Sequence, residues 1–399
     1  MRTQHCLYAL LSLMLGVGNL PAEMPRFEAV TIDPAAASKA CYAVTVADVD
    51  GDRRDDIVVV TEDQVLWYRN PEWDKHVILD NQTELDNVCI APLDIDGDGW
   101  VDFALGAGWT RVGTVQWISR GKEKQSDQLW NVYPIGREPW LHRMRFANVL
   151  DKDRPQLVIS PLNAVNAPGV KLTAFEIPED PREQRWPATV LDATLNRMHN
   201  HWHLDRNDDD VAETLTASQE GIHLVRRKDD GEFTKTKLSG ATEGDSPQQS
   251  GAGEIKTGYL KGGRSFIATI EPMHGTSVVV YTDPFGDGGP SGRHVLDNTL
   301  AQGHAIWPAD LDDDGTDELV VGHREAGNGP VRGPGVYIYD CTDEAGTTWK
   351  KHVLDDGGVA VEDLLCHDFN DDGLLDIVAV GRATLNVKLY LNQGEPSAN

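Results

Sequence analysis

Short runs of β-branched and other apolar residues recur along the chain, and each run follows a polar loop. Two clear copies are DVDGDRRDDIVVV, which begins at Asp48, and DLDDDGTDELVVG, which begins at Asp310. Apolar runs of this length, bounded by turn-forming residues, predict buried β-strands. Aligned on the first loop residue, seven copies begin 46, 54, 57, 53, 52 and 58 residues apart. They begin at Asp48, Asp94, Asn148, Asp205, Gly258, Asp310 and Asp368.

Each repeat has room for four strands, and the two ends of the chain complement each other. A recurring KHV or RHV segment, at residues 75–77, 293–295 and 351–353, marks an outer strand. The last repeat stops after its third strand, NVKLYLNQG, whereas an additional strand, RFEAVTID, precedes the first repeat. Repeats of about 50 residues with four strands are typical of propeller blades. We therefore predict an all-β fold: one seven-bladed β-propeller domain over residues 23–399, closed by an N-terminal strand that completes the last blade.

The first 22 residues differ from the rest in composition. An early arginine, an apolar run from Leu7 to Leu20 and a small residue at Ala22 predict a secretory signal peptide over residues 1–22. We therefore expect an exported protein, periplasmic or secreted, and no later segment is apolar enough to span a membrane. Four cysteines remain after residue 22, and their spacing leaves open whether any of them form disulfides.

The charge balance is strongly acidic, with 64 Asp and Glu against 36 Lys and Arg and a formal net charge of −28. Such a charge repels nucleic acids and anionic membrane surfaces, so neither is an expected partner. It favours cations instead. Nothing in the sequence calls for a second subunit, and we expect a monomer.

Oxygen-bearing side chains alternate in five of the loops, at positions 1, 3, 5 and 9. Hard oxygen ligands in a tight turn suit Ca²⁺, which takes about six to eight oxygens in flexible geometry. The loops are not EF-hands, because strands flank them and no glutamate stands at position 12. We predict about five structural calcium ions; the loops at Asn148 and Gly258 lack the acidic ligands. The predicted ligands are Asp48, Asp50, Asp52, Asp56, Asp94, Asp96, Asp98, Asp102, Asp205, Asn207, Asp209, Glu213, Asp310, Asp312, Asp314, Glu318, Asp368, Asn370, Asp372 and Asp376.

These loops resemble the FG-GAP/VCBS-type calcium repeats of integrin-like seven-bladed propellers. The resemblance covers nearly the whole chain after the signal peptide. It implies the propeller fold and calcium binding, but no activity, since function is set by the site and not by the fold.

Histidines recur at one position, six residues before the loop, in three of the repeats. They are His142, His199 and His304, and they are predicted to meet at one end of the ring. Further polar residues follow the second strands and are expected at the same end: Glu271, His274, His323, Arg324 and Glu325. We predict that these eight residues form the catalytic site.

Two chemistries suit this set of side chains. Neutral imidazoles from several blades can hold one transition metal, such as Zn²⁺ or Mn²⁺. The same groups can also abstract a proton beside a carbonyl without a metal, while a cation holds the developing enolate. Both chemistries lead to β-elimination or dehydration of a carbohydrate.

The segments EPMHG and GHRE, together with the histidines, are similar to the propeller part of the aldos-2-ulose dehydratase/isomerase family. That resemblance implies metal-dependent dehydration of a keto-sugar. We therefore expect a carbon–oxygen lyase, a dehydratase or a polysaccharide-lyase-like enzyme, with a keto-sugar or oligosaccharide as substrate. The alternative hypothesis is a non-catalytic, adhesion-type propeller that binds a glycan or a protein on the same face.

Overall fold

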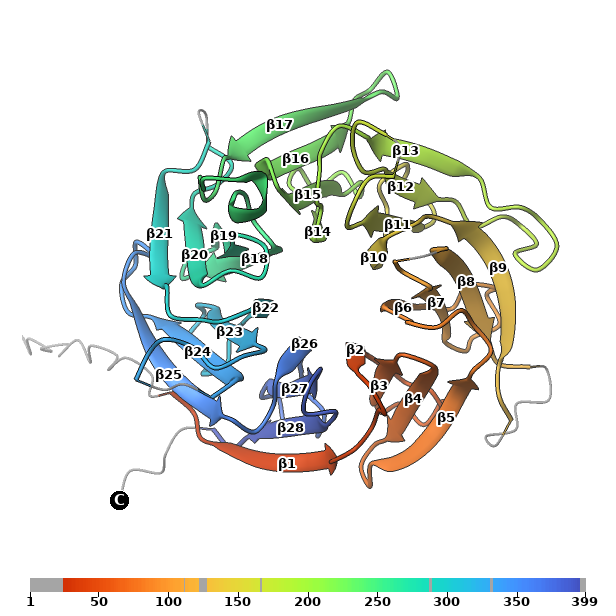
Figure 1. The fold of residues 1–399 in the computed structure, drawn as a ribbon, viewed down its shortest axis with the longest axis horizontal. Coiled ribbons are helices and arrows are strands. Elements are labelled where there is room, and N and C mark those ends of the chain that lie inside the picture. The colour runs from red at the N-terminus through yellow and green to blue at the C-terminus, as the bar shows by residue number, and fades with distance from the viewer. Residues whose placement is uncertain are drawn as a thin grey trace, which may run out of the picture.

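Seven four-stranded antiparallel sheets surround a central axis in the computed structural model (Figure 1). The structure describes residues 24–110, 112–121, 128–165, 167–286, 289–330 and 333–394. The predicted all-β, seven-bladed propeller is confirmed. The predicted signal peptide, residues 1–22, lies outside the described residues.

Within each blade the strands follow one another from the axis to the rim. The inner strands are β2 (Cys41–Ala47), β6 (Cys89–Leu93), β10 (Leu141–Ala147), β14 (Asn200–Leu204), β18 (Glu254–Leu260), β22 (Gly303–Ala309) and β26 (Val361–His367). The second strands are β3 (Asp56–Thr61), β7 (Asp102–Ala107), β11 (Gln156–Pro161), β15 (Glu213–Ser218), β19 (Arg264–Glu271), β23 (Glu318–His323) and β27 (Asp376–Gly381). The third strands are β4 (Gln64–Arg69), β8 (Thr114–Ser119), β12 (Leu172–Phe175), β16 (Gly221–Arg227), β20 (Ser277–Thr282), β24 (Gly335–Cys341) and β28 (Val387–Asn392). The outer strands are β5 (Asp74–Asp80), β9 (Asn131–Arg137), β13 (Ala188–Asp192), β17 (Phe233–Ser239), β21 (Gly292–Asp297), β25 (Trp349–Asp356) and β1 (Phe27–Asp33). A short 3₁₀ helix, η1 (Pro247–Gln249), lies between blades four and five.

The ring closes as the sequence predicts. Strand β1 pairs antiparallel with β28, with Phe27 opposite Asn392, and becomes the outer strand of the blade that β26 begins. In Figure 1 the red strand β1 lies beside the blue strands of the C-terminal blade. The first and last repeats are thus joined through one sheet.

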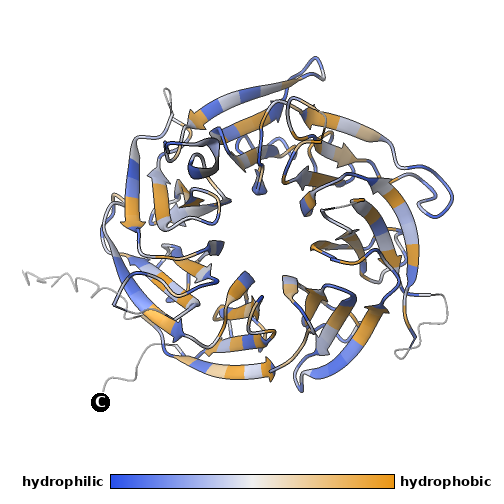
Figure 2. Ribbon diagram, in the orientation of Figure 1, coloured by the Kyte–Doolittle hydropathy of each residue, from blue (hydrophilic) through white to orange (hydrophobic). Residues whose placement is uncertain are grey.

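The blades are held together by apolar layers between neighbouring sheets. Among the described residues, seven buried hydrophobic clusters form. Most combine side chains from two adjacent blades, and the cluster around Trp117 and Leu141 extends over blades one, two and three. Both faces of a second strand are covered, so residues 57–60 of β3 are all fully buried. This explains why the second strands read as continuous apolar runs and not as alternating ones. Figure 2 shows hydrophobic residues in the strands of every blade and mainly hydrophilic connecting loops.

The structure also settles two smaller questions. Cys41, Cys89, Cys341 and Cys366 are all free thiols, and the first, second and fourth are buried. Within the described residues, no helix has the length and apolar character needed to cross a membrane.

Candidate functional site

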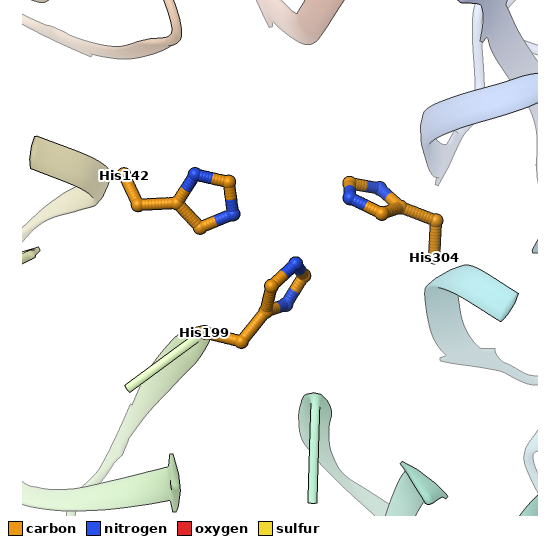
Figure 3. Close-up of side chains that lie close together, drawn as sticks. All are labelled: His142, His199 and His304. Atoms are coloured by element: carbon orange, nitrogen blue, oxygen red, sulfur yellow. The ribbon is translucent and has the colours of Figure 1, made fainter. Parts of the chain in front are cut away.

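The three histidines predicted from the shared register meet near the axis of the ring (Figure 3). One ring nitrogen of each lies within 4.8 Å of those of the other two. The side chains are buried, with exposed fractions of 6% for His142 and 0% for His199 and His304. They come from blades three, four and six, so the site exists only when the ring is closed. We call this end of the ring the histidine end, and the opposite end, where the acidic loops lie, the loop end.

β-Bulges place two of these histidines. The pairing of β10 with β11 shifts between Leu141 and Arg143, which leaves His142 as the extra residue. The pairing of β22 with β23 shifts in the same way around His304. A bulge inserts one unpaired residue and re-aims its side chain. His199 directly precedes β14 and needs no bulge.

Hydrogen bonds to Nδ1 set the tautomers of two histidines. His199 Nδ1 lies 3.1 Å from the carbonyl oxygen of Gly253 and 2.9 Å from Glu254 Oε1. His304 Nδ1 donates to the carbonyl oxygen of Glu362. Because these partners only accept, both Nδ1 atoms carry the proton and both Nε2 atoms present a lone pair. An acceptor behind Nδ1 is the usual support of a metal-binding imidazole.

A fourth histidine joins the group. The ring centroid of His274 lies 4.8 Å from that of His199 and 4.9 Å from that of His304. His274 lies in a turn that is closed by a hydrogen bond from Gly275 N to the Pro272 carbonyl, and its backbone is left-handed, with φ 53°. The Nε2 atoms of His274 and His199 are 3.0 Å apart. Two lone pairs would repel at this distance, so either one nitrogen carries a proton or both point at one cation.

All four imidazoles are held in the neutral form. Burial lowers the pKa of His142, His199 and His304, and the pKa of His274 falls to about 2. The positive charge of Arg324 lowers each of these pKa values further. Neutral imidazole is the form that binds a metal or accepts a proton.

Two buried carboxylates, those of Glu254 and Glu362, lie next to the histidines. Glu254 receives Arg143 Nη2 at 3.3 Å and Asn200 Nδ2 at 2.5 Å, in addition to His199. Burial alone would raise the pKa of Glu254, but Arg143 and His199 outweigh it and lower the pKa. Glu362 lies between two guanidinium groups, with Arg324 Nε at 2.6 Å and Arg382 Nη1 at 2.9 Å.

Not all of the other predicted catalytic residues reach the histidine cluster. The carboxylate of Glu271 is held within its own blade and the preceding loop: it accepts from Thr242, Thr269 and Tyr281 and pairs with Arg293 at 2.5 Å. His323 packs on Tyr337, with ring centroids 4.9 Å apart, and its Nδ1 donates to the Glu325 carbonyl.

The side chain of Glu325 is exposed. Of the residues that follow the second strands, the structure therefore brings His274 and Arg324 to the histidines. It does not bring Glu271, His323 or Glu325 into the cluster.

Sequence reasoning missed Glu254 and Arg143. They lie on different blades and are 111 residues apart, so no local motif links them. One signal was present: four residues before the loop, the seven repeats have Val44, Ile90, Met144, His201, Glu254, Ile306 and Leu364. Glu254 is the sole carboxylate in that series, which marks it as a departure from the repeat.

The acidic loops at the loop end fold alike. In the first, the Asp48 carboxylate accepts from Asp52 N at 3.1 Å and Arg53 N at 2.9 Å, and Val49 N donates to Asp56 at 3.0 Å. Three loops bring carboxylates within 4.8 Å of one another: Asp48, Asp50 and Asp56; Asp94, Asp96 and Asp102; Asp310, Asp312 and Glu318.

The loops at Asp205 and Asp368 repeat the backbone pattern, with Asp210 N and Gly373 N each 2.8 Å from the first carboxylate. In the loop of blade three, the neutral side chain of Gln156 takes the place of the position-9 carboxylate, and its Oε1 accepts from Val149 N at 2.9 Å.

Burial and crowding raise the pKa of four position-9 carboxylates, those of Asp56, Asp102, Glu318 and Asp376. Burial is the first cause, and neighbouring loop carboxylates add to it. The pKa reaches about 7 at Asp56 and Asp102 and about 9 at Glu318. A bound cation would relieve both effects, because it compensates the lost hydration and the repulsion.

Comparison with known proteins gives one sequence relative. A family model described as the β-propeller domain of aldos-2-ulose dehydratase matches residues 112–284, a segment that contains His142, His199, Glu254 and His274. The aldos-2-ulose dehydratase of Phanerodontia chrysosporium is 26% identical over 316 residues, which cover 73% of this chain and 34% of that protein. The chain thus spans about a third of the length of this curated relative. It is similar to the propeller part of a carbohydrate dehydratase.

Two solved structures share the fold. BBS1N in complex with ARL6DN, soaked with lead, has a TM-score of 0.57 at 13% identity, with 95% of this chain and 99% of that chain covered. An Agrocybe aegerita lectin that recognises non-reducing terminal N-acetylglucosamine has a TM-score of 0.52 at 12% identity, with 84% and 91% covered. At these identities the likeness shows the propeller architecture alone. The FG-GAP/VCBS-type resemblance stays a prediction.

Proposed function

We propose that the protein is a carbohydrate dehydratase, a carbon–oxygen lyase that acts on a keto-sugar or oligosaccharide at the histidine end of the ring. The observation that carries the proposal is the convergence of four buried, neutral histidines from blades three to six. Similarity to aldos-2-ulose dehydratase supports the choice of a sugar substrate and a dehydration.

The residues fit a transition-metal ion. His142 has two buried ring nitrogens, and His304 a buried Nε2, for which the described residues offer no hydrogen-bond partner. Three imidazoles with an open fourth position match the ligand sets of catalytic Zn²⁺, and Mn²⁺ is a further candidate. His142, His199 and His304 would hold the ion, and Glu254 and the Glu362 carbonyl orient two of them. When bound, such an ion polarises a sugar carbonyl as a Lewis acid.

The side chains around the histidines can perform the proton transfers of a dehydration. His274 is the least buried of the four histidines, and its neutral ring can accept the proton from the carbon next to the carbonyl, because the negative charge that develops on the sugar raises the lowered pKa of the ring as the proton moves. As the new carbon–carbon double bond forms, the bond from the adjacent carbon to its hydroxyl breaks. The leaving oxygen takes up the proton that His274 had accepted, so that one water molecule is released and His274 returns to its neutral form. The guanidinium group of Arg324 places a fixed positive charge beside the histidines, where it stabilises the negative charge of the enolate.

Activity on a panel of keto-sugars tests this proposal. We expect elimination to give a conjugated enone, followed by ultraviolet absorbance and by NMR of the product. His274→Gln should lower kcat by about 10²–10⁴-fold, the usual contribution of a general base. The matched control is His294→Gln on the outer strand β21, which should keep full activity.

A metal-loaded protein that turns over no keto-sugar, but binds glycans on an array, would contradict the enzyme proposal. That result would support the non-catalytic binding propeller instead.

We also propose that the five acidic loops bind structural Ca²⁺ and that the protein is exported. The shared loop geometry supports all five sites, and the raised pKa values of Asp56, Asp102, Glu318 and Asp376 support four of them. Export rests on the sequence of residues 1–22. Mass spectrometry of the protein made with its full N-terminus tests it: a mature chain that begins after residue 22 is expected, and an uncleaved chain kept inside the cell would refute it.

A further inference from the structure

A cavity lies on the axis, on the loop-end side of the histidines. Its volume is about 340 Å³, and all seven inner strands contribute to its wall. None of the four clustered histidines lines it. The buried ion pair of Arg143 on β10 with Glu254 on β18 crosses the axis between the histidines and this space. We call this space the axial cavity.

A buried lysine faces the axial cavity without a partner. Lys256 on β18 is 4% exposed. In the part of the chain that the structure describes, its ammonium group forms no ion pair and no hydrogen bond. Its Nζ lies 4.6 Å from the ring centre of Trp202 and 5.3 Å from that of Trp307. A buried ammonium group is costly unless an anion pairs with it.

The other charges of the cavity do not neutralise Lys256. Arg143 is already paired with Glu254. Arg145 uses Nη1 to donate to Asn200 Oδ1 at 2.9 Å and to the His201 carbonyl at 2.7 Å. Both of these acceptors are uncharged, so the guanidinium keeps its charge and its other N–H groups. Asp363 is the one unpaired carboxylate in the wall, and it accepts from Val44 N at 3.2 Å.

When Lys256 is protonated, Arg145 and Lys256 outnumber Asp363, and the axial cavity carries a surplus of positive charge in a protein whose formal net charge is −28. A local surplus of the sign opposite to that of the whole molecule requires an explanation. An anionic ligand would supply the missing partner for Lys256 and for the free N–H groups of Arg145.

The wall also offers groups for a sugar. Trp202 and Trp307 lie edge to face, with ring centroids 5.9 Å apart, and both are partly exposed to the cavity side. Indole rings pack well against the C–H faces of sugars, and a carboxylate such as Asp363 accepts hydrogen bonds from hydroxyls. The volume lies at the lower end of the roughly 300–1,000 Å³ of small-molecule pockets.

We propose that the axial cavity binds a small sugar acid, a uronate or an aldonate. Its carboxylate pairs with Lys256 and Arg145, its hydroxyls bond to Asp363, and its carbon skeleton packs on Trp202 and Trp307. This site shares none of these residues with the histidine cluster, so it stands whether or not the chain is a dehydratase.

Isothermal titration of the full chain in calcium-containing buffer tests the proposal, with glucuronate, gluconate, glucose and inorganic phosphate as probes. We expect the two sugar acids to bind and to raise the melting temperature, and glucose to do neither. Lys256→Met should weaken sugar-acid binding at least tenfold. The matched control, Lys237→Met on the exposed face of β17, should leave binding unchanged.

The proposal would be overturned if neither sugar acid bound to the unmodified protein, or if binding to the Lys256→Met variant were equally tight. Phosphate that binds as tightly as glucuronate would also overturn it, since the cavity would then recognise charge alone. If Lys256→Met fails to fold, the fluorescence change that glucuronate causes in the unmodified protein is compared with the change in Trp202→Phe and Trp307→Phe, in each of which it should be smaller. A sugar acid that leaves this fluorescence unperturbed is not in the cavity.

Discussion

At the scale of single residues, Glu254 links the histidine cluster to the wall of the axial cavity. It orients His199 on one side and neutralises Arg143 on the other. Both charges are almost fully buried, with side-chain exposures of 7% for Arg143 and 3% for Glu254. Removal of one partner from a buried pair leaves an uncompensated charge, which costs far more than the pair itself contributes.

We therefore expect Glu254→Leu to destabilise the protein by about 3–5 kcal/mol. The double variant Arg143→Met/Glu254→Leu should regain most of that loss, because it removes both charges. Urea unfolding followed by tryptophan fluorescence measures both. A double variant no more stable than Glu254→Leu would show that the pair is not the source of the effect.

Lys256 makes stability depend on pH. Burial, and then the neighbouring Arg145, lower its pKa from 10.5 to about 7. Glu254 on the same strand and Asp363 on β26 act in the opposite direction, and Arg143 adds to the lowering. Between pH 7 and 10.5 the unfolded chain binds a proton that the folded chain does not, so the free energy of unfolding rises with pH there.

Lys256→Met lacks this contribution. In the absence of ligand we expect the variant to be more stable than the unmodified protein at pH 7, by a few kcal/mol at most, and the advantage to shrink towards pH 10. Urea unfolding of both proteins at several pH values measures the difference in their free energies of unfolding. The contributions of the other titrating groups are the same in both proteins and cancel. An advantage that is constant over this range would refute the lowered pKa.

At the scale of elements, the sequence repeat determines some features of the fold and leaves others undetermined. Periodicity predicted the blades, the strand order and the position of every loop, because each repeat carries its own apolar runs. The bulges at His142 and His304 left no mark in the sequence, since a bulge depends on pairing with the next strand. The sequence also placed three histidines in register, but it could not show that Glu271, at the end of a second strand, is engaged within its own blade.

Loss of one acidic loop should remove one calcium ion. Asp312→Ala takes away a carboxylate that lies within 4.8 Å of Asp310 and Glu318. We expect the variant to bind about one Ca²⁺ fewer than the unmodified protein and to melt at a lower temperature, by the few degrees that correspond to loss of one bound ligand. Calcium titration by calorimetry, together with melting in excess chelator, measures both.

Asp153→Ala, in the loop of blade three that lacks the predicted calcium ligands, is the matched control and should change neither quantity. If chelator leaves the melting temperature of the unmodified protein unchanged, the loops are not structural calcium sites.

Ring closure determines the behaviour of the whole molecule. Seven apolar layers hold seven blades, and β1 is the one strand that joins the N-terminal segment to the last blade. Without β1, the third strand of that blade, β28, would present an open edge of unpaired backbone groups.

Deletion of residues 24–33 should therefore lower the melting temperature and cause concentration-dependent association. Calorimetry and size-exclusion chromatography at several concentrations measure these effects. A truncated protein that stays monomeric with an unchanged melting temperature would contradict a closing role for β1.

The central claim is that the closed ring assembles a histidine metal centre on its axis. Element-resolved metal analysis of the purified protein tests it most directly, with His142→Ala/His304→Ala beside a His294→Ala control. The account predicts one zinc, manganese or other transition-metal ion per chain in the unmodified protein and the control, and none in the double variant, with the calcium content equal in all three. A transition-metal content that is zero in the unmodified protein, even after reloading, or that survives in the double variant, would contradict it.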